Sequence, residues 1–170
     1  MRIVVNDANI LIDLVDLGLL HHFFALEFEF LTTSLVLDEL FDEQQEALLP
    51  YIDGDVLEVH DMEADDLIAI TIIQQGKPKL SQQDCSAFYQ AQKNEGTLLT
   101  SDNALRKFAK EKAVEVHGHL WVFDCMVAAE TISPERASEK LKELCEVINP
   151  KLNLPKKECD RRFQEWGEDI

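Results

Sequence analysis

Basic residues are almost absent from the first half of this sequence. Up to Gly76 there are 17 acidic residues and one basic residue, Arg2, whereas from Lys77 onward there are 16 acidic and 15 basic residues. The net charge of −17 counts against a nucleic-acid ligand, because phosphate backbones are bound through lysine and arginine. It does not exclude one, since binding responds to local patches of charge. A solvated acidic face accounts for most of these acids.

Long apolar runs and paired cysteines are missing as well. No run approaches the roughly 20 apolar residues that a membrane-spanning helix needs, and the N-terminal segment shows no cleavage site of a secretory signal. The four cysteines form no Cys-x-x-Cys pair, which argues against a zinc knuckle or a redox motif: Cys85, Cys125, Cys145 and Cys159. We therefore expect a cytoplasmic protein with reduced thiols and no membrane contact.

Short apolar segments alternate with segments of helical periodicity. The predicted strands are 2–6, 28–33, 55–60, 97–101 and 114–118. The predicted helices are 9–26, 34–49, 63–75, 81–94, 102–112, 120–130 and 133–148. This alternation predicts an α/β fold, a three-layer α/β/α sandwich around a mostly parallel sheet of about five strands. We expect one domain over residues 1–170, in which residues 133–170 form a C-terminal helical extension.

Acidic residues follow two of the predicted strands. Asp7 comes directly after the first strand and Asp102 after the fourth. Open parallel sheets place their functional sites outside the carboxyl ends of the strands, where the strand order reverses. If these two strands are neighbours, both carboxylates meet in one crevice. Glu39, expected inside the helix after the second strand, and Asp84, expected at the start of the helix before the fourth, fit the same crevice.

Several carboxylates in one crevice repel each other, and a divalent cation is the usual remedy. An oxygen-only donor set suits Mg²⁺ or Mn²⁺, whereas zinc prefers cysteine or histidine. Such ions activate water for in-line attack on a phosphodiester and stabilise the leaving oxygen. The acids therefore indicate metal-dependent hydrolysis that needs no nucleophilic side chain.

Four segments resemble the PIN-domain family, metal-dependent nucleases that include the VapC-like toxins of toxin–antitoxin modules. The segments are "IVVNDANILIDL", "TTSLVLDEL", "LSQQDCSAF" and "LLTSDNALRKFAKEKAVEVHGHL", and the resemblance covers roughly residues 1–130. The last is the most specific, with a strand, a Thr-x-Asp pattern, a basic amphipathic helix, a second strand and a glycine turn.

The resemblance implies a PIN-like fold and a ribonuclease that leaves a 5′-phosphate. It implies catalytic and metal-binding roles for Asp7, Glu39, Asp84 and Asp102, and supporting roles for Asn9 and Ser101. The cofactor it implies is Mg²⁺ or Mn²⁺. The partners it suggests are an RNA substrate, an antitoxin protein that covers the acidic groove, and a second copy of the chain in a homodimer.

Some residues allow more than one interpretation. Asp38 lies beside Glu39, and we choose Glu39 because Asp-Glu-Leu follows the apolar run in the family's register. Arg106 and Lys107 lie near enough to Asp102 to contact RNA phosphates, whereas Lys110 is interpreted as helix surface. Trp121 stands where related sequences often have a small residue. The histidines follow no metal spacing and are interpreted as surface or packing residues: His21, His22, His60, His117 and His119.

Two other functions stay open at this point. Taken singly, Asp7 and Asp102 could be helix N-caps, and Glu39 and Asp84 solvated helix residues. A non-catalytic PIN-like module that binds nucleic acid or protein would suit the bulk negative charge, although such a module would be expected to lose some of the four acids. A phosphatase-like hydrolase would want Asp-x-Asp after the first strand, where this chain has Asp-x-Asn.

Overall fold

The computed structural model describes residues 1–167, and its centre is one five-stranded sheet. The strands are β1 (Arg2–Asn6), β2 (Phe28–Thr33), β3 (Leu57–His60), β4 (Thr97–Leu99) and β5 (Val116–His117). Their order is β3-β2-β1-β4-β5, and all neighbouring strands are parallel. The predicted parallel sheet is confirmed, and the first and fourth strands are neighbours.

Helices account for most of the remaining chain. They are α1 (Ala8–Leu17), α2 (Leu20–Phe24), α3 (Ser34–Leu37), α4 (Asp42–Asp53), α5 (Ala64–Gly76), α6 (Gln82–Lys93), α7 (Asn103–Glu111), α8 (His119–Ala128), α9 (Pro134–Glu143) and α10 (Lys156–Gly167). A π-helical turn, η1 (Leu144–Ile148), and a 3-10 turn, η2 (Pro150–Leu152), join α9 to α10. Among residues 1–167, no helix is long and apolar enough to cross a membrane.

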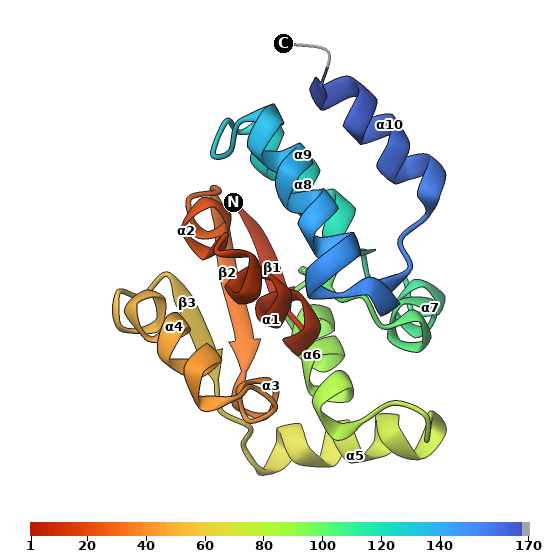
Figure 1. Cartoon of the computed structure of the whole chain (residues 1–170). Coiled ribbons are helices and arrows are strands. Elements are labelled where there is room, and N and C mark those ends of the chain that lie inside the picture. The colour runs from red at the N-terminus through yellow and green to blue at the C-terminus, as the bar shows by residue number, and fades with distance from the viewer. Residues whose placement is uncertain (168–170) are drawn as a thin grey trace.

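The helices cover both faces of the sheet (Figure 1). The chain passes from β1 to β2 and β3 in one direction, then enters β4 and continues to β5 in the other. Because right-handed crossovers are the rule, this reversal puts the helices of the two halves on opposite faces. Helix α6 packs on β1, β2 and β4, and α4 packs on β3. The three-layer α/β/α prediction is confirmed.

Burial on both faces explains the apolar strands. Val4, Val5, Leu98 and Leu99 are fully buried at the centre of the sheet, as expected for parallel strands covered on both sides. The apolar runs therefore predicted the strands well: β1 and β2 match the prediction, and the ends of the other three differ by at most two residues.

The structure divides two of the predicted helices. The helix predicted over 9–26 breaks at Gly18, whose φ of 70° is the left-handed conformation that glycine adopts without strain. The helix predicted over 34–49 is also two helices. The Gln45 side chain donates hydrogen bonds to the Leu37 and Leu40 carbonyls (3.0 Å each), which satisfies the end of α3. Glu39 therefore lies in the turn between α3 and α4, and its predicted place inside a helix is wrong.

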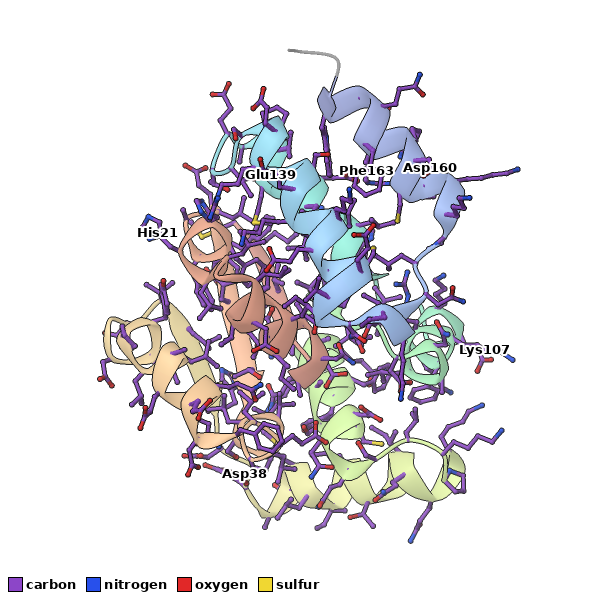
Figure 2. The ribbon with its side chains drawn as sticks, viewed as in Figure 1. His21, Asp38, Lys107, Glu139, Asp160 and Phe163 are labelled. Carbon is purple, nitrogen blue, oxygen red and sulfur yellow. The ribbon has the colours of Figure 1, made fainter. Side chains whose placement is uncertain are left out.

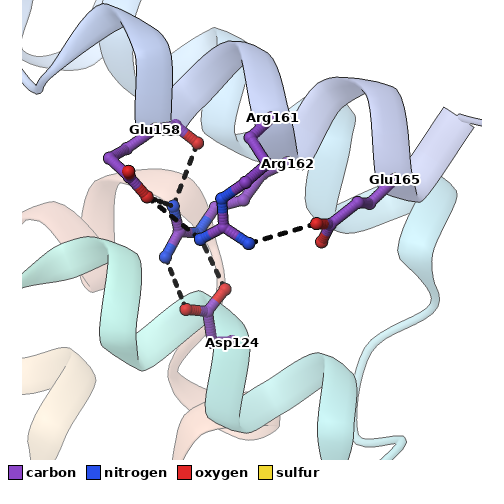
Figure 3. Close-up of polar contacts among 5 residues, drawn as sticks. All are labelled: Asp124, Glu158, Arg161, Arg162 and Glu165. Atoms are coloured by element: carbon purple, nitrogen blue, oxygen red, sulfur yellow. Dashed lines mark hydrogen bonds and ion pairs between the residues drawn. The ribbon is translucent and has the colours of Figure 1, made fainter.

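The C-terminal helix α10 is held by a buried arginine (Figure 3). Arg162 is 7% exposed, and its Nε and Nη2 atoms donate to the two carboxylate oxygens of Asp124 on α8 (2.8 and 2.6 Å). Its Nη1 atom donates to the Glu158 carbonyl (2.9 Å). Residues 168–170, the end of the predicted extension, lie outside the described residues, and the division into domain and extension stays a prediction.

Replacing Arg162 with methionine is expected to lower the free energy of unfolding by about 2–3 kcal/mol, measured by urea denaturation. Removing one partner of a fully buried ion pair lowers the free energy of unfolding by more than this. The Asp124 side chain is 44% exposed, so water can hydrate its carboxylate in the variant. Arg161→Met is the matched control, because Arg161 is half-exposed and contacts Glu158 and Glu165 on its own helix. Equal effects of the two changes would contradict the assigned role of Arg162.

Candidate functional site

The first strand ends where the sheet reverses its order, between β1 and β4. The Asp7 backbone N–H donates to the Leu99 carbonyl (3.0 Å), which ties the two strand ends together. The Asp7 side chain is nearly inaccessible, and its Oδ1 atom accepts a hydrogen bond from the Ala8 N–H (2.9 Å) as the N-cap of α1. Asp7 is therefore a helix cap as well as a buried carboxylate at the switch point.

Thr100 connects Asp7 to the loop that carries Asp102. Its Oγ1 atom donates to Asp7 Oδ2 (2.7 Å) and accepts from the Asp102 N–H (3.1 Å). Asn9 adds a second link, because its Nδ2 atom lies 3.4 Å from Asp7 Oδ2 and its Oδ1 atom accepts from the Ser101 N–H (3.1 Å). The contribution of Ser101 to this hydrogen-bond network is its backbone N–H group. Thr100 was not predicted as a site residue, although the Thr-x-Asp pattern contains it.

Asp102 and Asp84 each use one carboxylate oxygen to cap a helix. Asp102 Oδ1 accepts from the Leu105 N–H (2.8 Å) at the start of α7. Asp84 Oδ2 accepts from the Ser81 N–H (3.1 Å), while Ser81 Oγ accepts from the Asp84 N–H (3.0 Å), a capping box at the start of α6. In the described part of the chain, the other oxygen of each carboxylate receives no hydrogen bond and is available to a ligand.

A buried hydroxyl contact brings the turn of Glu39 toward α6. Thr33 Oγ1, at the end of β2, lies 2.8 Å from Ser86 Oγ on α6 and accepts from the Val36 N–H (3.1 Å) as the N-cap of α3. Helix α3 consequently packs against α6, the helix of Asp84. Glu39 follows α3 and is exposed, as is Asp38, which is labelled beside α3 in Figure 2.

The four predicted acids act on one another electrostatically. Burial raises the pKa of Asp7 to about 7, and the negative charges of Asp84 and, to a smaller degree, Glu39 add to the rise, while the Thr100 hydrogen bond opposes it. Partial burial of its carboxylate and the charge of Asp84 raise the pKa of Glu39. Burial, with a further contribution from the charge of Asp102, raises the pKa of Asp84. Asp84 thus couples to each of the other three acids.

This coupling favours Glu39 over Asp38 as the fourth acid. Of the two neighbours, Glu39 is the one whose charge raises the pKa of Asp7. Three raised pKa values in one crevice are typical of a functional site, because stability alone gives no reason to gather carboxylates.

The carboxylate oxygens of the four acids are the type of donor that a divalent cation such as Mg²⁺ prefers. In residues 1–167, no three histidine, cysteine, aspartate or glutamate side chains are grouped so that they could hold a metal ion by themselves. The coupled group still offers oxygen atoms only, which suits Mg²⁺ or Mn²⁺. A cation here would also relieve the repulsion that raises the pKa values. Water ligands would have to complete its coordination, as is usual for Mg²⁺.

The two predicted RNA contacts lie beside the acids, in a cavity of about 720 Å³. Arg106 and Lys107 line it together with Ser101 and Asn103, the sequence neighbours of Asp102. Lys107 extends from α7 away from the body of the protein (Figure 2). The four acids do not line this cavity. The group of four acids and the cavity are therefore two separate features, and the cavity is lined by the two sequence neighbours of Asp102.

Comparison with known proteins shows the family of this chain. A family model described as a PIN domain matches residues 3–168, nearly the whole chain. A search of curated proteins finds no match. PIN domains are generally nucleases and typically use divalent metals.

Proposed function

Because this chain belongs to the PIN-domain family, we propose that it is a divalent-metal-dependent endoribonuclease. The observation that carries the proposal is the coupled group of Asp7, Glu39, Asp84 and Asp102 at the switch point of the sheet. The group offers oxygen donors only, and burial and mutual repulsion raise the pKa values of Asp7, Glu39 and Asp84. Phosphodiester hydrolysis by a metal-activated water makes use of both properties.

The roles of the individual acids follow from their surroundings. We assign Asp7, Asp84 and Asp102 to holding Mg²⁺ or Mn²⁺, directly or through water. When bound, the ion supplies a Lewis acid that lowers the pKa of water and neutralises phosphate charge. Thr100 and Asn9 orient the Asp7 carboxylate through the hydrogen bonds described above. Asn9 and Ser101 also fix the loop before Asp102.

Glu39 suits proton transfer better than the other three acids. Its exposed position leaves it open to water, and its raised pKa brings it closer to neutral pH, where a general base is most effective. We therefore assign Glu39 to orienting the attacking water and accepting its proton. Attack that expels the 3′-oxygen would leave a 5′-phosphate on the product.

An antitoxin partner and a homodimer are further proposals. A basic segment laid over the crevice would neutralise the acids that repel one another there. Co-purification of the full chain with the product of a neighbouring gene, followed by loss of cleavage in that complex, would support an antitoxin. A free active enzyme with no such partner would contradict it.

Cleavage of a labelled single-stranded RNA tests the proposed function. We expect cutting with Mn²⁺ or Mg²⁺, none with chelator, and none by a separately purified Asp7→Asn, Asp102→Asn double variant. Product ends should carry a 5′-phosphate. Cutting that persists in chelator or in the double variant would assign the activity to another site or to a contaminant.

One observation favours the alternative, a non-catalytic binding module. Asp7, Asp84 and Asp102 all accept helix-capping hydrogen bonds, a structural role that would retain them without catalysis. The two functions differ in their response to metal. A binding module would neither cut RNA nor gain thermal stability from Mn²⁺ relative to the double variant.

A further inference from the structure

The cavity beside Asp102 concentrates unpaired positive charge. Four basic side chains line it, from α7 and from η2: Arg106, Lys107, Lys110 and Lys151. Within residues 1–167, none of the four forms an ion pair, and no acidic residue lines the cavity. Acids make up 33 of the 170 residues. A cavity wall with four basic residues and no acidic one therefore favours an anion. Lys110, interpreted from the sequence as helix surface, is exposed on α7 and also lines this cavity.

The cavity opens at the amino end of α8. Gly118 is the N-cap of this helix, and among residues 1–167 no side chain caps the first N–H groups of α8, which suits an anion there. A Cβ atom on Gly118 would lie 2.4 Å from Arg106 Nη1. The missing side chain therefore makes room for the Arg106 guanidinium at the end of the helix, where its charge and the helix dipole act on the same space.

A buried histidine of the same wall has one ring nitrogen without a hydrogen-bond partner among residues 1–167. His119 is 3% exposed, and its Nε2 atom lies 2.7 Å from Asp13 Oδ2. Its Nδ1 atom is buried and has no hydrogen-bond partner among the described residues. A buried polar atom is costly to leave unsatisfied, and His119 lines the cavity. Because the Nε2–H group faces the Asp13 carboxylate, Nδ1 is left as an acceptor, and a ligand hydroxyl would be a suitable donor to it.

Two aromatic rings complete the wall. The His117 and Trp121 rings are stacked, with centroids 4.5 Å apart and planes 4° from parallel. Both residues line the cavity. The Trp121 ring is also stacked on Phe28, with centroids 5.7 Å apart and planes 11° from parallel, so it is part of a packed aromatic stack. Trp121 therefore shapes this end of the groove.

We propose that this cavity, between α7, the start of α8 and η2, is a subsite for a backbone phosphate of single-stranded RNA next to the cleaved bond. The inference rests on the proposed function for the direction of the strand across the acids. It adds Lys110, Lys151 and the α8 amino end to the contacts. Gly118 follows β5 at the same carboxyl edge of the sheet that carries Asp7 and Asp102, so one strand can reach both features.

Binding in chelator tests the subsite without cleavage. The probe is a fluorescein-labelled single-stranded RNA of about ten nucleotides, and fluorescence anisotropy gives its Kd at several salt concentrations. Arg106→Gln, Lys151→Gln should raise Kd about tenfold or more and lower the salt slope by about two. The control Arg136→Gln, Lys142→Gln removes the same charges from the exposed surface of α9 and should change Kd less than twofold. Thermal denaturation checks that both variants fold.

The outcomes separate the subsite from the proposed function. Equal Kd values for the two double variants would overturn the subsite while metal-dependent cutting by the wild type would stand. Loss of binding in the cavity variant alone, without cutting by the wild type, would support the subsite and refute the nuclease. Binding of poly-aspartate in place of RNA would assign the cavity to an acidic protein segment and overturn the proposal.

Discussion

Changing Asp7 to asparagine is expected to lower metal-dependent RNA cleavage by about 10²- to 10³-fold, because the amide removes a charge that transition-state stabilisation needs. The change is nearly isosteric, and the Ala8 N–H can still donate to the amide oxygen. Asp84→Asn should have an effect of similar size, since Asp84 couples to the other three acids. The measurement is the single-turnover cleavage rate with saturating Mn²⁺.

Two neighbouring acids provide the matched control for this prediction. Glu39→Gln should lower the rate by about 10- to 100-fold, because water can partly replace an exposed general base. Asp38→Asn removes the same charge one residue away, at the exposed end of α3, and should leave the rate within about twofold of the wild type. An effect of Asp38→Asn as large as that of Glu39→Gln would move the fourth acid to Asp38.

The sheet could be predicted from sequence because its strands are buried on both faces. Runs such as those around Val4 and Leu98 are apolar without alternation, and only central parallel strands require this. The helix breaks were harder to predict, because apolar periodicity continues through them. Gly18 marks one break in the sequence. The other depends on a side-chain contact, from Gln45 to the end of α3, that only the folded chain reveals.

The acids could be placed from sequence because parallel strands end at one edge of the sheet. The sequence predicted that Asp7 and Asp102 meet on the condition that their strands are neighbours, and the strand order of the structure meets that condition. The role of Thr100 was not predictable from its residue type, because a buried threonine in a strand end is ordinary. Nor was the basic cavity, since its wall joins α7 and α8 to Lys151 of η2, and the spacing of these segments is set by tertiary packing.

The buried Asp7 carboxylate should make the metal-free protein less stable as the pH rises. Its pKa is about 7 in the folded state against a usual value of 3.8. Below pH 4 the Asp7 carboxyl is protonated in both the folded and the unfolded protein. Between pH 4 and 7 it is protonated only in the folded protein. Stability from this group is therefore present at low pH and lost as pH passes through 7. The difference corresponds to about 4 kcal/mol at most, and we expect 2–4.

Asp7→Asn isolates this effect from the other titrating groups. At pH 8 in chelator the variant should be about 2–4 kcal/mol more stable than the wild type by urea denaturation, and at pH 4 the two should be nearly equal. Saturating Mn²⁺ at pH 8 should stabilise the wild type by about 3 kcal/mol at a hundred times its Kd, and the variant much less. A buried carboxylate that destabilises the metal-free protein, and that a bound cation stabilises, is better explained by a role in function than by a role in folding. The same pH dependence in both proteins would mean that Asp7 ionises normally, and would contradict a metal site at which burial and repulsion oppose its ionisation.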